Sequence, residues 1–277
     1  MIRAALALVE SYYRQAPRWS YFMGCSNGGR EGLIAAQRYP QLFDGIIAGS
    51  PAFDLTRVMV AEAWNTDMLA GIAPRDAHGR PELSQALSDS DLNLLAYAVL
   101  ARCDALDGAR DGPVSDPPAC HFDPGVLACR RGQSHGCLST RKLTAIRKVF
   151  AGPVSRDGRR LYSSWPYDPG IAAPGWRFWR LGSAQMPALN VLITPAAING
   201  LVLGGKAPAI DLWRFDFESD PARIARVAKD LDALSRDYSA LRKRHGKLVS
   251  LMKSGLRAPR KRFARLRCAR LQMTPAC

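Results

Sequence analysis

The sequence predicts an α/β protein in which a parallel sheet carries an inserted, cysteine-rich subdomain. Two observations lead to this prediction. The first 65 residues alternate between helix and strand patterns, which is typical of a parallel sheet. Residues 66–210 differ in composition, because they hold most of the prolines and four of the seven cysteines. We therefore predict a core segment over residues 1–65, an inserted subdomain over 66–210, a return to the core over 211–248 and a basic tail over 249–277.

The elements of the first segment follow one another in a regular order. Apolar residues recur at helical spacing over residues 2–14, which predicts an amphipathic helix. The aromatic run WSYFMG, residues 19–24, predicts a buried strand. A helix is expected over GREGLIAAQRYP and a second buried strand over FDGIIAGSP, each ending at a proline.

Two later segments also have clear patterns. STRKLTAIRKVF, residues 139–150, predicts a helix inside the insertion. The segment from Asp220 to Leu248 predicts one long helix followed by a strand that begins near Lys247. These two predictions complete the expected order of elements.

The positive charge is concentrated at the end of the chain. The net charge is +15, a balance that suggests nucleic acid or another anionic surface. Residues 249–277 contain eight Lys and Arg residues and no acidic residue. Interleaved apolar residues such as Phe263 and Leu266 allow this tail to be a nucleic-acid or lipid-binding arm. The alternative, which we prefer, is a solvated tail or the product of a shifted reading frame, with no nucleic-acid partner.

The cysteines indicate an oxidising compartment. Four of them lie within 35 residues in a loop-rich segment, which suggests disulfide bonds whose pairing the spacing alone leaves open. The first residues are interrupted by Glu10 and lack a small-residue cleavage site, so they do not predict a signal peptide. Residues 181–205 carry no charge, but prolines, glycines and asparagines interrupt them, and we expect no membrane span.

The stretch GCSNG, residues 24–28, fits the G-x-S-x-G pattern between a predicted strand and a predicted helix. In such a turn the serine projects from a strained apex, so Ser26 is the candidate nucleophile. The backbone N–H of Asn27 is the candidate oxyanion donor. Two alternatives remain: a glycine-rich turn with an incidental serine, and Cys25 as a thiol nucleophile one position away from the apex.

The segment SYFMGCSNGGREGLIAAQRYPQLFDGIIAGSPA resembles the core of the tannase and feruloyl esterase family. The resemblance extends over roughly residues 2–248. It implies an α/β-hydrolase core with an inserted lid, a small aromatic ester as substrate, an acyl-enzyme intermediate and secretion or export to the periplasm. In this family a cysteine beside the nucleophile pairs with a cysteine beside the catalytic histidine. Cys25 matches the first half of that pattern, and we expect it to lack its partner.

An acidic loop lies between Cys103 and Cys120. Asp104, Asp107 and Asp111 can converge on one hard cation such as Ca²⁺, or they can be solvated aspartates of a polar turn. The resemblance favours a structural calcium in the lid. The ligands that it implies are the three carboxylates together with two carbonyl groups, those of Ala109 and Pro113.

The resemblance also implies the pairing of the lid cysteines. The expected disulfides are Cys103–Cys120 and Cys129–Cys137. Five aromatic residues of the insertion are expected to form lid core, although they could instead bind an aromatic ligand: Trp165, Tyr167, Trp176, Phe178 and Trp179.

The other two residues of a catalytic triad are not found. The four histidines are His78, His121, His135 and His245, and none stands in the order His-Cys that the family requires. No aspartate follows the predicted strand at residues 247–249. The resemblance therefore implies a chain truncated at both ends and an impaired or inactive esterase. The alternative is a non-catalytic fragment that binds calcium or an aromatic ligand.

Overall fold

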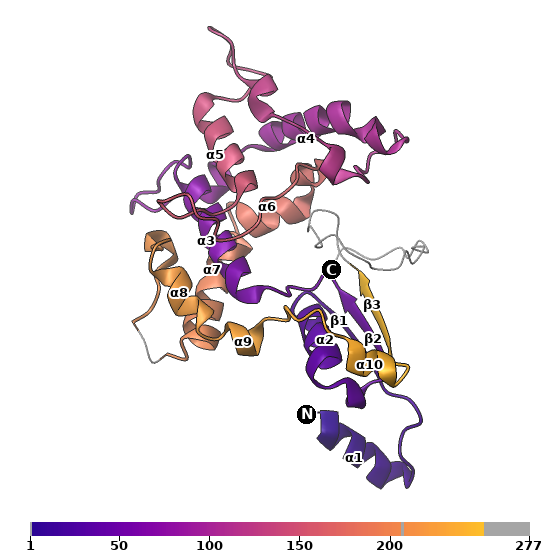
Figure 1. Ribbon diagram of the computed structural model, residues 1–277. Coiled ribbons are helices and arrows are strands. Elements are labelled where there is room, and N and C mark those ends of the chain that lie inside the picture. Colours follow the sequence, from indigo (N-terminus) through magenta and orange to yellow (C-terminus); the bar gives the residue numbers. More distant parts are fainter. Residues whose placement is uncertain (1, 206–207, 252–277) are drawn as a thin grey trace. The chain divides into compact units, whose positions relative to one another are not determined.

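The structure is a computed structural model in which residues 2–205 and 208–251 are described. The chain divides into two compact units (Figure 1). Of the described residues, the sheet unit comprises those up to Leu55 and those from Ala228 to Leu251, and the helical unit comprises those from Thr56 to Val227. The predicted limits of the insertion, residues 66 and 210, both lie inside the helical unit. The earlier start has a local cause: helix α3 (Leu55–Ala70) runs through residue 66 without a break.

The described residues form one parallel sheet in the sheet unit, with the strand order β1-β2-β3. The strands are β1 (Tyr21–Cys25), β2 (Gly45–Gly49) and β3 (Lys247–Leu251). Cys25 is in register with Gly49, and Gly49 with Leu251, so the three carboxyl ends lie at one edge. In open α/β sheets this edge is where ligands bind.

The sheet has a covered face and an open face. Helix α2 (Asn27–Arg38) packs on β1 and β2, and its Ala35 and Ala36 join Ile46 of β2 in a buried cluster. Successive residues of a strand point to opposite faces. Met23, Ile47 and Val249, which are in register on the other face, are 79%, 41% and 39% exposed. The described sheet unit thus buries one side of its sheet much better than the other.

The remaining helices of the sheet unit are short or lie at its margin. Helix α1 (Ile2–Tyr13) has no buried residue, and only Ile2 packs against the cluster beneath α2. The others are η1 (Pro40–Leu42), α9 (Ala228–Leu231) and α10 (Ser239–Lys243).

The single long helix expected after Asp220 is wrong. The chain instead forms α8 (Asp220–Ala225), α9 and α10, with a non-helical stretch over residues 232–238. The cause is tertiary, because side chains of α2 bind carbonyl groups that a continuous helix would use for itself. Gln37 Nε2 donates to the carbonyls of Ala233 (3.0 Å) and Ser235 (2.9 Å), and Arg38 donates to those of Asp230 (3.0 Å) and Asp232 (2.9 Å).

The helical unit consists of helices joined by short 3₁₀ turns. Besides α3 and α8, its longer helices are α4 (Asp89–Cys103), α5 (Thr140–Ala151), α6 (Pro174–Arg180), α7 (Leu189–Ala196) and the π-helical turn η7 (Ala197–Val202). Its 3₁₀ turns are η2 (Leu83–Gln85), η3 (Asp104–Asp107), η4 (Pro117–Ala119), η5 (Pro124–Leu127), η6 (Pro169–Ala172) and η8 (Leu212–Arg214).

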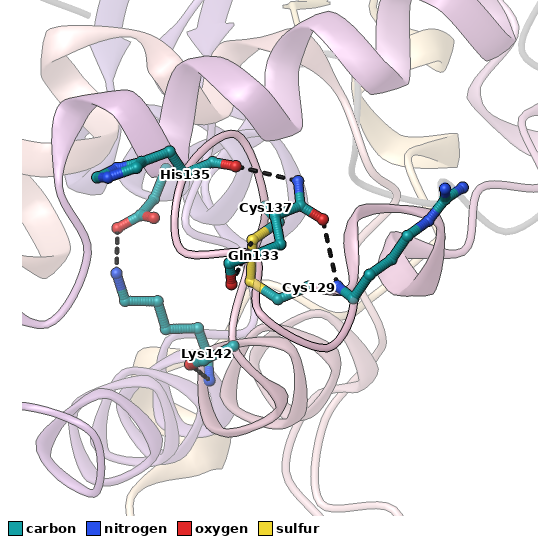
Figure 2. The surroundings of a disulfide bond; sticks show 8 residues. Cys129, Gln133, His135, Cys137 and Lys142 are labelled. Carbon is teal, nitrogen blue, oxygen red and sulfur yellow. Dashed lines mark hydrogen bonds and ion pairs between the residues drawn. A yellow bond between two sulfur atoms is a disulfide. The ribbon is translucent and has the colours of Figure 1, made fainter.

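A large apolar core and disulfide bonds hold the helical unit together. Leu95, Leu138, Ile146 and Leu181 are each at most 2% exposed and belong to one cluster. The disulfides Cys103–Cys120 and Cys129–Cys137 are both present, which confirms the pairing that the resemblance implied. Figure 2 shows the second of them, with Gln133 and His135 in the loop that it closes.

The aromatic residues of the insertion divide into two groups. Trp165, Tyr167 and Trp176 pack against the core, as expected. Tyr167 stacks on Phe150 with ring centroids 4.1 Å apart, and burial raises the pKa of its phenol. The other two aromatic residues are not part of this core: Phe178 is 42% exposed and Trp179 is 40% exposed.

Most elements predicted from the sequence are confirmed. The helices expected over residues 2–14 and 139–150 correspond to α1 and α5, and the two early strands to β1 and β2. Strand β2 is buried as expected, but β1 is not, because one face of the sheet is open there. In the part of the chain that the structure describes, no helix has the length and apolar character needed to cross a membrane. The predicted basic tail lies outside the described residues, apart from the end of β3.

Candidate active site

Ser26 occupies the turn between β1 and α2. Strand β1 ends one residue before it, and α2 begins one residue after it. Its backbone has φ 58° and ψ −114°, a conformation that is unfavourable for a residue with a side chain. Three backbone hydrogen bonds hold it there. Its N–H donates to the Gly49 carbonyl (2.9 Å), and its own carbonyl accepts from Arg30 (3.0 Å) and Ala52 (3.2 Å).

Glycines allow the strand, the turn and the helix to approach one another closely. A Cβ atom at Gly24 would lie 2.5 Å from the backbone carbon of Gly28. A Cβ at Gly29 would lie 2.3 Å from the Gly49 carbonyl oxygen, at the end of β2. A Cβ at Gly28 itself would meet no atom within 4 Å. The tight positions are therefore 24 and 29, whereas the last glycine of the G-x-S-x-G motif is not sterically required.

The turn leaves the reactive groups accessible. Ser26 and Asn27 are both exposed, and the Ser26 hydroxyl makes no capping hydrogen bond to the helix that follows. Asn27 is the first residue of α2, where a backbone N–H has no partner within the helix. An N–H at this position can donate to an oxyanion that forms beside the serine.

Ser50 is a residue of this edge that the sequence reasoning missed. It follows β2 and also has a positive φ, 39°. Its N–H donates to the Leu251 carbonyl at 2.6 Å, which joins the carboxyl ends of β2 and β3. The signal for it in the sequence was a Gly-Ser-Pro run directly after a buried strand.

Cys25 forms a disulfide bond, so the expectation that it lacks a partner is wrong. A cysteine in a disulfide has no thiolate to attack a substrate. This bond therefore also argues against the alternative in which Cys25, and not Ser26, is the nucleophile.

Within the described sheet unit, no histidine lies beside Ser26. His245 lies in the turn before β3, at the amino end of the strand, with φ 62°. Ser26 follows the carboxyl end of the parallel strand β1, so a strand length of about 15 Å separates the two positions. His78, His121 and His135 belong to the helical unit. Within the described residues of the sheet unit, the structure therefore identifies neither the base nor the acid of a triad.

The acidic loop contains oxygen ligands suited to calcium, but two of its carboxylates accept hydrogen bonds from N–H groups of the loop. An Asp104 carboxylate oxygen accepts from the Gly112 N–H (3.0 Å). Asp107 accepts from Ser115 (2.8 Å) and Ala109 (3.1 Å), and these N–H groups lower the pKa of its carboxyl. No three acidic, histidine or cysteine side chains of the described ranges come together as a metal site. The oxygen donors suit a hard cation, but as placed the carboxylates do not converge.

Comparison with known proteins decides the family. A family model described as "Tannase and feruloyl esterase" matches residues 1–256. The chain belongs to this family. It is 37% identical over 284 residues to mono(2-hydroxyethyl) terephthalate hydrolase of Piscinibacter sakaiensis, covering 89% of this chain and 47% of that protein. It is also 35% identical over 156 residues to a probable feruloyl esterase B-2 of Aspergillus flavus, covering 56% of this chain and 28% of that protein.

A solved structure supports the same fold. The crystal structure of an esterase from Aspergillus oryzae superposes with a TM-score of 0.71 at 26% identity, covering 90% of this chain and 46% of that one. The chain is thus an ester hydrolase homologue of the tannase and feruloyl esterase family with an α/β-hydrolase-like fold. The chain spans about half the length of this hydrolase and of this esterase.

Proposed function

We propose that this chain is a serine ester hydrolase that cleaves esters of aromatic carboxylic acids, with Ser26 as its nucleophile. The observation that carries the proposal is the strained backbone of an exposed serine at the carboxyl edge of a parallel sheet. Strain of this kind persists only where the surroundings enforce it, and it is concentrated at functional sites. The aromatic acid is suggested by relatives named as a terephthalate monoester hydrolase and feruloyl esterases.

In the proposed reaction the Ser26 hydroxyl attacks the ester carbonyl carbon. Its proton passes to a base, and the carbonyl oxygen becomes an oxyanion that accepts a hydrogen bond from the Asn27 N–H. Collapse of this intermediate expels the alcohol, which takes up a proton, and leaves an aromatic acyl group on Ser26. Water then attacks the acyl-enzyme, and the carboxylic acid is released.

Hydrolysis of aromatic and aliphatic esters tests this function. We expect the chain to hydrolyse methyl ferulate or a terephthalate monoester faster than the methyl ester of an aliphatic acid. Ser26→Ala should reduce the rate to that of buffer, while Ser134→Ala, at an exposed loop serine of the helical unit, should leave it unchanged. Hydrolysis that survives Ser26→Ala would contradict the proposal. Binding of the ester without any turnover would favour the non-catalytic alternative.

We further propose that the activity is impaired. The observation behind this is that His245, the described histidine of the sheet unit, lies at the opposite edge from Ser26. Without a base beside it the Ser26 hydroxyl is a weak nucleophile. We therefore expect turnover that depends on Ser26 but is only slightly faster than hydrolysis in buffer. A much higher rate would show that a base is supplied, and would overturn the impairment but not the hydrolase function.

A structural calcium remains part of the proposal. Asp104, Asp107 and Asp111 would supply carboxylates, and the carbonyls of Ala109 and Pro113 would complete the oxygen shell, so that the ion fixes the loop between Cys103 and Cys120. At about 100 times its Kd, calcium should stabilise the helical unit by about 2.7 kcal/mol.

A thermal denaturation series tests the calcium proposal directly. The melting temperature should rise with calcium, and Asp107→Asn should remove the rise. Asp116→Asn is the matched control, because Asp116 lies in the same loop but outside the predicted ligand set. A calcium effect that Asp107→Asn leaves intact, or no effect on the folded protein, would contradict the proposed site.

A further inference from the structure

A pocket of about 390 Å³ lies in the helical unit between the C-terminal part of α3 and the face of α5 from Thr140 to Lys148. We call it the α3–α5 pocket. Asp67 and Met68 line it from α3, and Ile72 from the turn that follows. Arg141 and Lys148 line it from α5, where residues seven apart lie on one helix face. Its volume is within the range of small-molecule sites, and it belongs to a different unit from Ser26.

The charged groups of the pocket are available to a ligand. Within the described part of the chain, the side chains of Asp67 and Lys148 form no hydrogen bond or ion pair. Burial raises the pKa of Asp67, and the positive charge of Lys148 only partly offsets this. The Asp67 side chain is exposed, so its carboxyl is accessible to a hydrogen-bond donor of a ligand.

The position of Arg141 is fixed by the protein. One of its guanidinium nitrogens donates to the Gly71 carbonyl at 3.0 Å. A guanidinium has five N–H donors, so the others remain for a ligand. Arg141 and Lys148 together give the pocket two cations against one carboxyl, which favours an anionic ligand group.

The floor of the pocket is apolar. Met68 and Ile72 are partly buried and pack against the main cluster of the helical unit, so the surface that they present is backed by a rigid core. The Thr144 hydroxyl lies between Arg141 and Lys148 along α5 and adds a neutral donor and acceptor. The pocket thus combines an apolar floor, a cationic side and one carboxyl.

We propose that the α3–α5 pocket binds a small carboxylic acid that carries a hydroxyl group on an apolar body. The ligand carboxylate accepts hydrogen bonds from Lys148 and Arg141, and its hydroxyl donates to Asp67. The apolar body lies on Met68 and Ile72. The site does not depend on hydrolysis at Ser26, so it stands or falls separately from the proposed function.

Isothermal titration of the full chain with 4-hydroxybenzoate tests this site. We expect saturable binding at one site, weakened about tenfold in Lys148→Gln because a charge-assisted hydrogen bond is lost. Benzoate, which lacks the hydroxyl, and 4-hydroxybenzyl alcohol, which lacks the carboxylate, should both bind more weakly. Asp67→Asn should bring the affinity for 4-hydroxybenzoate down to that for benzoate.

Two controls locate the binding. Ser26→Ala should bind 4-hydroxybenzoate as the unchanged protein does, which separates this pocket from the hydrolase site. Arg102→Gln removes one positive charge from an exposed position of α4 that does not line the pocket, and should have no effect. Any one of three results overturns the proposal. These are the absence of saturable binding to the folded protein, binding that neither Lys148→Gln nor Asp67→Asn changes, and binding that Ser26→Ala abolishes.

Discussion

The two units of this chain use different means to fix their structure. In the sheet unit, close contacts between backbone segments fix the structure around Ser26. The end of β2 approaches helix α2 so closely that a Cβ at Gly29 would lie 2.3 Å from the Gly49 carbonyl oxygen. In the helical unit, packed side chains and disulfide bonds fix the structure. Examples are the fully buried Leu95 and the disulfide Cys103–Cys120. The comparison teaches that a nucleophile can be positioned by a few glycines, whereas a helical insertion needs a large core and covalent ties.

The largest expected effect comes from removing the Cys103–Cys120 disulfide. Replacing both cysteines with alanine should lower the free energy of unfolding by about 3 kcal/mol, because the bond closes a loop of 17 residues and Cys103 is fully buried. The Cys129–Cys137 disulfide closes a shorter loop, with a sequence separation of 8. Replacing both of its cysteines with alanine should therefore lower the free energy of unfolding by less. Urea denaturation under oxidising conditions measures both. A greater loss for the shorter loop would show that the cross-links do not act as this comparison assumes.

A glycine pair tests the role of the backbone in the sheet unit. Gly29→Ala should destabilise the protein by about 2 kcal/mol, because the new methyl group overlaps the end of β2. Gly28→Ala is the control one residue earlier, where a Cβ meets nothing within 4 Å and α2 gains helix propensity. Denaturation midpoints of the two variants should therefore move in opposite directions. Equal losses would contradict the close approach.

An ion pair inside the helical unit should have a smaller effect. Asp91 accepts hydrogen bonds from Lys142 Nζ (2.6 Å) and the Ser88 N–H (2.8 Å). Burial opposes its ionisation, but these donors outweigh burial and lower its pKa. Asp91→Asn should cost about 1–2 kcal/mol at neutral pH.

The pH dependence of that loss follows from the direction of the shift. A lowered folded pKa stabilises the protein above the ordinary value of 3.8, and this stability disappears as the pH falls through the folded pKa. Melting temperatures of the two proteins should therefore converge in acid. Asp89→Asn, which breaks a pair whose carboxylate is 80% exposed, should cost less at neutral pH. Equal costs would contradict the importance given to burial.

The smallest expected effect is a gain in stability, and it comes from Asp67→Asn. Burial raises the pKa of Asp67, so its ionised form is unfavourable in the folded protein at neutral pH. Asp67→Asn should raise the melting temperature there, and the gain should vanish as the pH falls below 3.8, where both states are protonated. The N–H of Arg80 lowers the pKa of the exposed Asp76, so Asp76→Asn should give no such gain. A loss of stability in Asp67→Asn would contradict this account.

The sequence predicted the elements around Ser26 because they depend on local patterns. A strand, a G-x-S-x-G turn and an amphipathic helix are each recognisable over a few residues, and the structure has them as β1, Ser26 and α2. The expected burial of the strand was wrong, because β1 contains no buried residue. The two disulfides of the helical unit were predicted from the resemblance and not from spacing. Which glycines are tight could not be predicted, because the contact at Gly29 is made by Gly49, twenty residues further along.

Other features depended on contacts between distant parts of the chain. The segment after Asp220 has helical periodicity, but Gln37 and Arg38 bind its carbonyls from nearly 200 positions away and interrupt the helix. The α3–α5 pocket is equally invisible in the sequence, because Asp67 and Lys148 become neighbours only when two helices pack. The carboxylates of Asp104 and Asp107 face loop N–H groups, an arrangement that their spacing did not indicate.

Peptide mapping after incubation with an activated aromatic ester tests the central claim most directly. If Ser26 is the nucleophile, a 4-nitrophenyl ester of an aromatic acid should leave its acyl group on the peptide that contains Ser26, and mass spectrometry should find no such adduct in folded Ser26→Ala. This readout detects acylation even when turnover is slow. An acyl group on another residue, or no adduct on the folded protein, would contradict the account.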